Sequence, residues 1–152
     1  MLWRSRATEE GDCPLSGRRV FAFLEGGDDR VLDPAIEAVR SGGGRLVLVC
    51  TAPMPIGVAC GIPYQPALAP AWQSGDEIAR DVICRALARV PDDVPVTTMC
   101  AGPSLGASLA RLLCRVHPDL VFVSRRRTAA RCRRLADAKV ALVDRAGRAR
   151  LA

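Results

Sequence analysis

Short apolar runs recur along this chain, and segments with helical periodicity separate them. The fully apolar runs occupy residues 20–24, 46–50, 120–123 and 140–143. Strands that are apolar at every position are typical of a parallel sheet that helices bury on both faces. A further strand is expected over residues 94–100, where Pro95 favours a position at the sheet edge. The alternation therefore predicts an α/β fold with one doubly wound, five-stranded parallel sheet.

Helix-capping residues mark the segments between these strands. The expected helices cover residues 33–40, 74–90, 104–117 and 128–138. Asp33 precedes Pro34, which predicts an N-cap followed by a proline at the first helical position. Ser74 and Glu77 have the spacing of a capping box. The apolar residues of the second helix are predicted to share one inward face, formed by Ile78, Val82, Ile83, Leu87 and Val90.

The chain, at 152 residues, is long enough for one domain. We expect an arm at residues 1–17, a folded domain at 18–145 and a C-terminal tail at 146–152. Residues 52–73 are rich in proline and predict a long loop near the carboxyl end of the second strand. We expect this loop to fold over a cleft at the first and fourth strands. The same density of prolines excludes a membrane-spanning helix there.

The cysteines and the histidine form no recognisable metal or redox motif. The chain has 7 cysteines without a C-x-x-C pair, and His117 is its only histidine. An odd number of cysteines in apolar surroundings is typical of free thiols in a reducing compartment. The N-terminus lacks the apolar core of a secretory signal. We therefore expect a cytoplasmic protein without disulfides, a metal or a membrane segment.

Three short segments together resemble the universal stress protein family: residues 20–28, Gly102 at the start of the third helix, and residues 118–123. The resemblance implies the strand order 3-2-1-4-5 and an adenine nucleotide alpha hydrolase-like fold. It also implies a nucleotide site at the carboxyl ends of the strands and a homodimer that pairs through the fifth strand. Glu25, followed by Gly26, matches the aspartate that ends the first strand in the family.

The nucleotide motif of that family is degenerate in this chain. Members that bind nucleotides carry G-x-x-G-x9-G-[ST] after the fourth strand, where glycines let backbone N–H groups approach the phosphates. Here Ser124 and Arg127 stand at the first two glycine positions, and Asp137 stands where the second glycine loop is expected. These differences predict that the chain has lost ATP binding and carries no cofactor. ATP or another adenine nucleotide is the alternative.

An arginine cluster follows the fourth strand and contributes to a net charge of +6. Its members are Arg125, Arg126, Arg127, Arg131, Arg133 and Arg134. The cluster is either a solvated helix face or an anion site, in which the guanidinium groups of Arg125 and Arg127 would hold a phosphate. Nucleic acid is not favoured, because no aromatic residues are interleaved with the arginines.

The expected degenerate nucleotide cleft contains Glu25, Gly26, Gly102, Ser124, Arg125 and Arg127. No Ser-His-Asp, paired-carboxylate or metal-ligand arrangement is indicated. We therefore expect a non-enzymatic regulatory or association module, which forms a homodimer and binds an unknown protein partner. The main alternative is a nucleotide- or phosphate-binding stress sensor that uses arginine side chains, and a small phosphohydrolase is a third.

Overall fold

The computed structural model describes residues 17–51, 75–101 and 105–151. Several predicted features lie outside the described residues: most of the arm, the loop at 52–73, and Ser74, Gly102 and Ser104. The expectation that the loop covers a cleft therefore stays a prediction.

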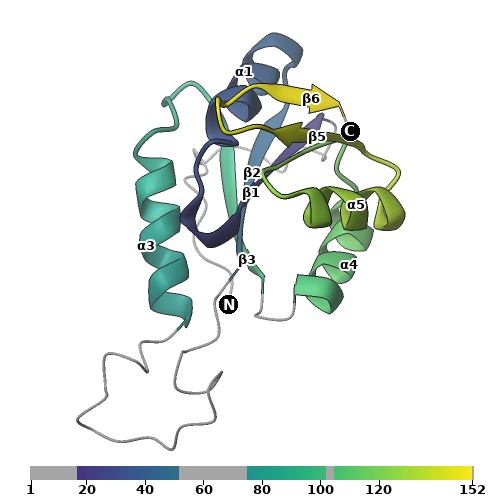
Figure 1. The fold of residues 1–152 in the computed structure, drawn as a ribbon. Coiled ribbons are helices and arrows are strands. Elements are labelled where there is room, and N and C mark those ends of the chain that lie inside the picture. Colours follow the sequence, from purple (N-terminus) through teal and green to yellow (C-terminus); the bar gives the residue numbers. More distant parts are fainter. Residues whose placement is uncertain (1–16, 52–74, 102–104, 152) are drawn as a thin grey trace, which may run out of the picture.

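The described residues form strands and helices that alternate as predicted (Figure 1). The strands are β1 (Arg19–Leu24), β2 (Arg45–Thr51), β3 (Val96–Ala101), β4 (Leu120–Val123), β5 (Lys139–Val143) and β6 (Ala149–Leu151). The helices are α1 (Leu32–Gly42), α3 (Gly75–Leu87), α4 (Leu105–Val116) and α5 (Arg126–Leu135), and a 3-10 turn, η1 (Glu25–Gly27), follows β1.

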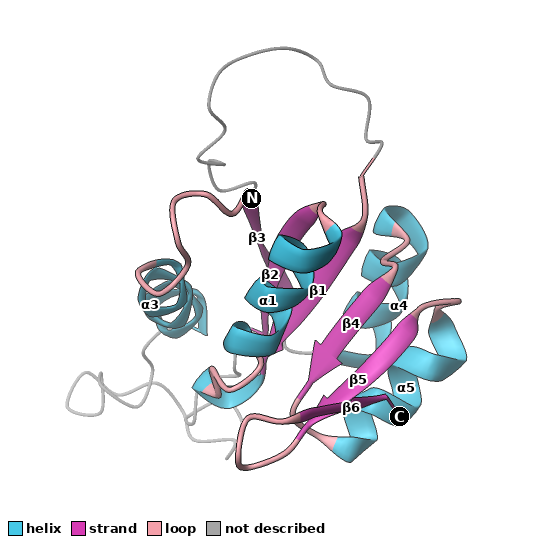
Figure 2. Cartoon of the chain, turned by 90° about the horizontal axis from the view of Figure 1, so that it is seen from above, coloured by secondary structure: helices cyan, strands magenta, loops and turns pink. Residues whose placement is uncertain are grey.

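The strands form one sheet in the order β3-β2-β1-β4-β5-β6 (Figure 2). Strands β1 to β5 are parallel to their neighbours, so the predicted α/β class and the order 3-2-1-4-5 are confirmed. β6 pairs antiparallel with β5 and lies in the segment that was expected to be a tail. The sheet thus has six strands rather than the predicted five.

A tight turn brings this last segment back onto β5. The Asp144 carboxylate accepts hydrogen bonds from the backbone N–H groups of Ala146 and Arg148 at 2.8 and 3.0 Å. Gly147 has a φ of 74°, which glycine adopts without strain. Because β6 covers the outer edge of β5, the predicted dimer contact through β5 would require β6 to leave.

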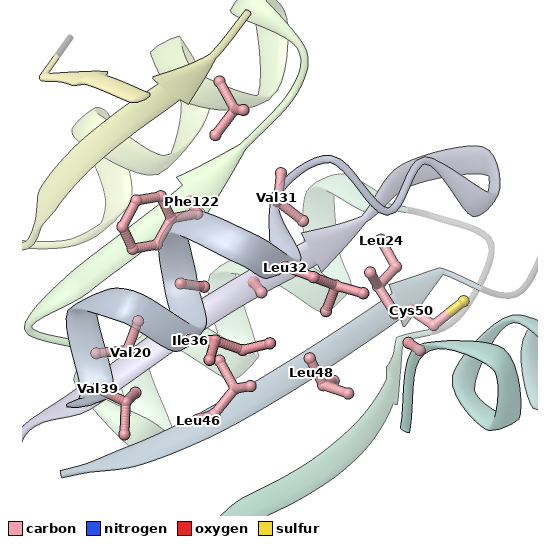
Figure 3. Close-up of a cluster of buried hydrophobic side chains, with 14 of the residues drawn as sticks. Val20, Leu24, Val31, Leu32, Ile36, Val39, Leu46, Leu48, Cys50 and Phe122 are labelled. Atoms are coloured by element: carbon pink, nitrogen blue, oxygen red, sulfur yellow. The ribbon is translucent and has the colours of Figure 1, made fainter. Parts of the chain in front are cut away.

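Helices cover both faces of the sheet (Figures 1 and 2). On β1, Val20, Ala22 and Leu24 point into the core beneath α1 and α3, part of which Figure 3 shows. Phe21 and Phe23 point into the second core, beneath α4 and α5. Both faces of β1 are therefore buried, which explains why its sequence has no polar side chain after Arg19.

The start of α1 differs from the prediction. Val31 is the N-cap residue and the helix begins at Leu32, so Asp33 lies inside the first turn instead of capping it. Leu32 is fully buried, and burial of this side chain sets the start of the helix. The carboxylate of Asp33 instead accepts a hydrogen bond from Arg89 at 3.0 Å.

The inward face of α3 agrees with the prediction in part. Val82 is buried, and Ile83 and Val90 pack against the core as predicted. Ile78 and Leu87, however, are each 37% exposed, and the other buried residues of the helix are Ala79 and Ala86. Apolar residues occur around much of this helix, so hydrophobicity alone does not identify the side that contacts β2 and β3. The helix packs through its small side chains, which allow a close approach to the sheet.

The described residues also bear on the expected absence of membrane and metal features. No helix among them has the length and apolar character that crossing a bilayer requires. No three His, Cys, Asp or Glu side chains of this part of the chain gather as a metal site would need. The described cysteines form no disulfide; Cys50 and Cys132 are buried, whereas Cys84, Cys100 and Cys114 are exposed.

Candidate functional site

The predicted cleft residues follow two neighbouring strands, at the point where the strand order reverses. β1 and β4 lie side by side in the sheet, although α1, β2, α3, β3 and α4 lie between them in the described sequence. The turn η1 follows β1 directly, and Ser124 and Arg125 join β4 to α5. Ligands of doubly wound sheets bind at such a reversal, so this is where a functional site is expected.

Glu25 is the buried centre of this site. It is only 5% exposed, because η1 places its side chain against the first turn of α5. Its Oε1 accepts a hydrogen bond from the Thr128 hydroxyl, while Oε2 has no hydrogen-bond partner among the described residues. Burial raises the pKa of Glu25 above the ordinary 4.5, and this effect outweighs the lowering by Thr128 and Arg125.

A second buried oxygen lies beside the first. Ser124 Oγ makes no hydrogen bond with a described residue, yet it is close enough to Glu25 and Asp28 to contribute to lowering the pKa of each carboxyl. A buried polar atom without a partner costs about 1–3 kcal/mol. Protonation of Glu25 would place an O–H donor next to these oxygens, which agrees with its raised pKa.

Arg125 covers the site on its solvent side. Gly26 has a φ of 62°, and a Cβ added there would lie 3.3 Å from Arg125 Nη2. The guanidinium therefore lies over η1, where its charge opposes the burial effect on the pKa of Glu25. In the same loop Asp28 pairs with Arg30, and this hydrogen bond is the main cause that lowers the pKa of Asp28.

The first turn of α5 carries an unbalanced positive charge. Arg125 is the N-cap residue without a side-chain cap, and the turn contains no acidic residue. Arg126 and Arg127 follow, both exposed. Positive side chains at the positive end of a helix dipole destabilise the helix unless an anion lies nearby. Glu25 brings carboxyl oxygens close to the Thr128 hydroxyl and to the backbone of Arg125 in this turn, so helix and turn contact each other here through polar groups.

The structure brings together four of the predicted cleft residues: Glu25, Gly26, Ser124 and Arg125. Arg127 points into solvent and forms no ion pair within the described part of the chain. Gly102 lies outside the described residues.

Two residues of the site were missed by sequence reasoning, Thr128 and Cys132. Both are buried on the inner side of α5, four positions apart. Burial, with a smaller effect of Glu25, raises the pKa of the Cys132 thiol to about 12. A hydroxyl inside the apolar stripe of this helix was the available signal, but its partner on η1 could not be identified without the fold.

A small cavity adjoins this site in the described part of the chain. A cavity of about 40 Å³ lies next to η1, lined by Leu24, Gly27 and Asp29 together with residues of α3. Ligand pockets usually enclose about 300–1,000 Å³. The cavity therefore has room for water rather than for a nucleotide, and the chemistry at hand is that of a buried carboxyl, two hydroxyls and an exposed guanidinium.

No protein-family model matches the chain, and no curated protein sequence matches it. Solved structures, however, share its fold. A universal stress protein family member from Burkholderia pseudomallei superposes with a TM-score of 0.60 at 22% identity, over 80% of this chain and 92% of that one. One from Arabidopsis thaliana with AMP bound gives 0.56 at 15% identity, over 83% and 92%. A universal stress protein in complex with cAMP gives 0.52 at 18% identity, over 84% and 97%.

Proposed function

Because the chain has the fold of the universal stress proteins, we propose that it is a non-enzymatic regulatory module that acts by association. In this proposal it no longer binds ATP, because it lacks the cradle of backbone N–H groups that would hold the phosphates. The position of Glu25 carries this proposal. Its carboxyl group lies buried at the N-terminus of α5, against the Thr128 hydroxyl and close to the backbone of Arg125.

A helix N-terminus attracts anions through its free N–H groups and its dipole. In this chain a side-chain carboxyl already lies there, and the Arg125 side chain covers the adjoining turn. A triphosphate would have to displace a buried side chain and approach a carboxyl group at short range. The small cavity beside η1 offers no alternative place for it.

The similar solved structures indicate whether the fold or the residues of this chain would account for a loss of nucleotide binding. Two of them hold AMP or cAMP, so the fold itself is compatible with an adenine nucleotide. A loss of binding must then come from the residues of this chain. Ser124 and Arg125 bring side chains to the strand-to-helix loop, and Arg127 brings one to the first turn of α5, where a cradle needs bare backbone.

Calorimetric titration of the purified chain with ATP, ADP, AMP and cAMP tests this proposal. We expect no binding heat for any of the four nucleotides. The Arabidopsis thaliana protein, titrated with AMP, serves as the positive control. Purified chain that carries adenine nucleotide in equal amount, or that binds ATP with an affinity independent of residues 124–127, would contradict the proposal.

A phosphate-binding sensor is the second candidate, because the side chains of Arg125 and Arg127 are exposed and neither forms a salt bridge with a described residue, although the charge of Arg125 acts on the nearby Glu25 carboxyl. If ATP or inorganic phosphate binds, the double variant Arg125→Ala/Arg127→Ala should abolish binding. The variant Arg131→Ala/Arg133→Ala removes the same charge further along α5 and should retain it. Equal affinity in both variants would reject the arginine site.

A further inference from the structure

The two faces of the sheet carry helices of different charge. α4 and α5 contain seven arginines and no acidic residue. All seven side chains are exposed, and none forms an ion pair with a described residue. On the opposite face, Arg40 of α1 pairs with Asp93 at 2.9 Å and Arg85 of α3 pairs with Asp81 at 3.0 Å. The positive charge without a partner is therefore concentrated on the α4 and α5 face.

A groove lies on the same side of the molecule, between the C-terminal ends of α4 and α5. Its volume is about 280 Å³, and much of its lining is apolar, from Leu113, Pro118, Leu135 and Ala136. The helices end where β4 and β5 begin, so the groove lies at the other end of the sheet from Glu25. Figures 1 and 2 show α4 and α5 side by side there, and their packing agrees with this view.

The polar groups at the groove restrict what can enter it. Asp137 and His117 contribute polar side chains to the lining, and both helices direct the negative ends of their dipoles towards the groove. A carboxylate is therefore disfavoured inside the groove, and an uncharged apolar side chain is favoured. Arginines lie within one helical turn on both sides: Arg111 and Arg115 beside Cys114, and Arg131 and Arg134 beside Leu135.

We propose that this surface binds an acidic segment of a protein partner, with one apolar side chain of the segment in the groove and its flanking carboxylates on the arginines of α4 and α5. Guanidinium groups bind carboxylates in two-point contacts, and a buried apolar anchor surrounded by charged contacts is a common form of protein recognition. The inference rests on the proposed association function and supplies the class of its partner.

Other occupants fit the surface less well. The described aromatic residues, Phe21, Phe23 and Phe122, are all buried, so this part of the chain offers no ring on which single-stranded bases could stack. The large apolar side chains that are exposed among the described residues, Ile78, Leu87 and Leu151, lie outside α4 and α5. Insertion into a bilayer through these helices therefore lacks the side chains that it needs.

Fluorescence anisotropy with two labelled peptides tests the proposal on the unchanged chain. One peptide has a central leucine flanked by glutamates, and the other has alanine in place of the leucine. We expect the leucine peptide to bind about tenfold more tightly, because the groove buries its additional carbon atoms. Equal affinity of the two peptides, or no binding of either, would overturn the proposal.

Paired variants separate the charge contribution from the groove. Arg131→Ala/Arg134→Ala should weaken the binding of both peptides about fivefold. Arg40→Ala/Arg85→Ala removes equal charge from the opposite face and should leave both affinities within about twofold of those of the unchanged chain. Cys114→Phe should fill the groove and remove the advantage of the leucine peptide. Circular dichroism confirms that each variant is folded.

A duplex DNA of arbitrary sequence tests whether the surface prefers the acidic peptide to another polyanion. We expect it to bind more weakly than the leucine peptide at physiological salt. DNA that binds more tightly, with the same loss in the Arg131→Ala/Arg134→Ala variant, would overturn the proposal in favour of a general polyanion surface. Because the peptide measurements contain no ATP and use a surface at the opposite end of the sheet from Glu25, their failure leaves the calorimetric result on ATP unaffected.

Discussion

At the scale of single residues, Glu25 couples the stability of the fold to pH. Its pKa is raised above 4.5 in the folded chain, with burial as the largest cause. The folded state then retains a proton at pH values where the unfolded state has released it. The stabilisation from Glu25 is therefore complete below the unfolded pKa and is lost as the pH rises through the folded pKa.

We expect the Glu25→Gln variant to lose this pH dependence. Glutamine keeps the acceptor for Thr128, and its amide N–H₂ supplies a donor towards Ser124, while no charge is buried. The free energy of unfolding of the variant should exceed that of the unchanged chain at neutral pH, and the difference should shrink towards acid pH. Urea titrations of both chains over a pH series measure it. A difference that does not vary with pH would contradict the buried-acid interpretation.

The Thr128 hydroxyl is the second residue-scale test. Thr128→Val preserves the shape of the side chain but removes the donor to Glu25 Oε1. We expect a loss of about 1–3 kcal/mol in the free energy of unfolding at neutral pH, and a further rise in the pKa of Glu25, because this hydrogen bond lowers it. Urea titration and NMR titration of the Glu25 carboxyl carbon measure the two effects. Thr128→Ser keeps the hydroxyl and should leave the pKa close to its original value.

At the scale of elements, α3 shows that the position of a helix on the sheet decides which of its apolar residues are buried. Ala79 is 1% exposed and the adjacent Ile78 is 37% exposed. We expect Ile78→Gln to change the free energy of unfolding by less than about 0.5 kcal/mol. Ala79→Gln should cost about 1–3 kcal/mol, because the larger side chain overpacks the contact with the sheet. Urea titration measures the free energy of unfolding of both variants. A larger loss for Ile78→Gln than for Ala79→Gln would instead support the inward position of Ile78 that the sequence predicted.

The buried strands were predictable because burial on both faces requires a run of residues that is apolar at every position. β4 spans Leu120–Val123, which is the apolar run from which this strand was predicted. β6 has no such apolar run, because its three residues are all exposed. Its pairing with β5 depends instead on the turn at Asp144. The position of the predicted cleft residues after β1 and β4 followed from the order of the elements and the family resemblance, while their role as a cleft stays a prediction. The contact of Glu25 with Thr128 was not predictable, because these residues are far apart in sequence and meet only when β1 and β4 are neighbours.

At the scale of the whole molecule, the two ends of the sheet have different properties. At the carboxyl ends of β1 and β4, the Glu25 side chain is buried and the Arg125 guanidinium lies over Gly26. At the opposite end, a groove remains open between α4 and α5. The proposed partner surface therefore lies at the opposite end of the sheet from the predicted cleft residues, so the two proposals can be tested independently.

The edges of the sheet decide whether two copies can pair through their strands. β6 covers β5 and presents only three residues, with Leu151 74% exposed, so it offers few backbone groups to a second chain. We expect the full chain to dimerise weakly, and a chain that ends at Gly147 to dimerise more tightly, because loss of β6 exposes the apolar β5 with its unpaired N–H and C=O groups. Sedimentation velocity at micromolar concentration compares the two chains, with Leu151→Ala as a control that keeps β6. A shortened chain that is folded by circular dichroism yet remains monomeric would show that β6 does not protect this edge, and a homodimer would then have to form through a different surface.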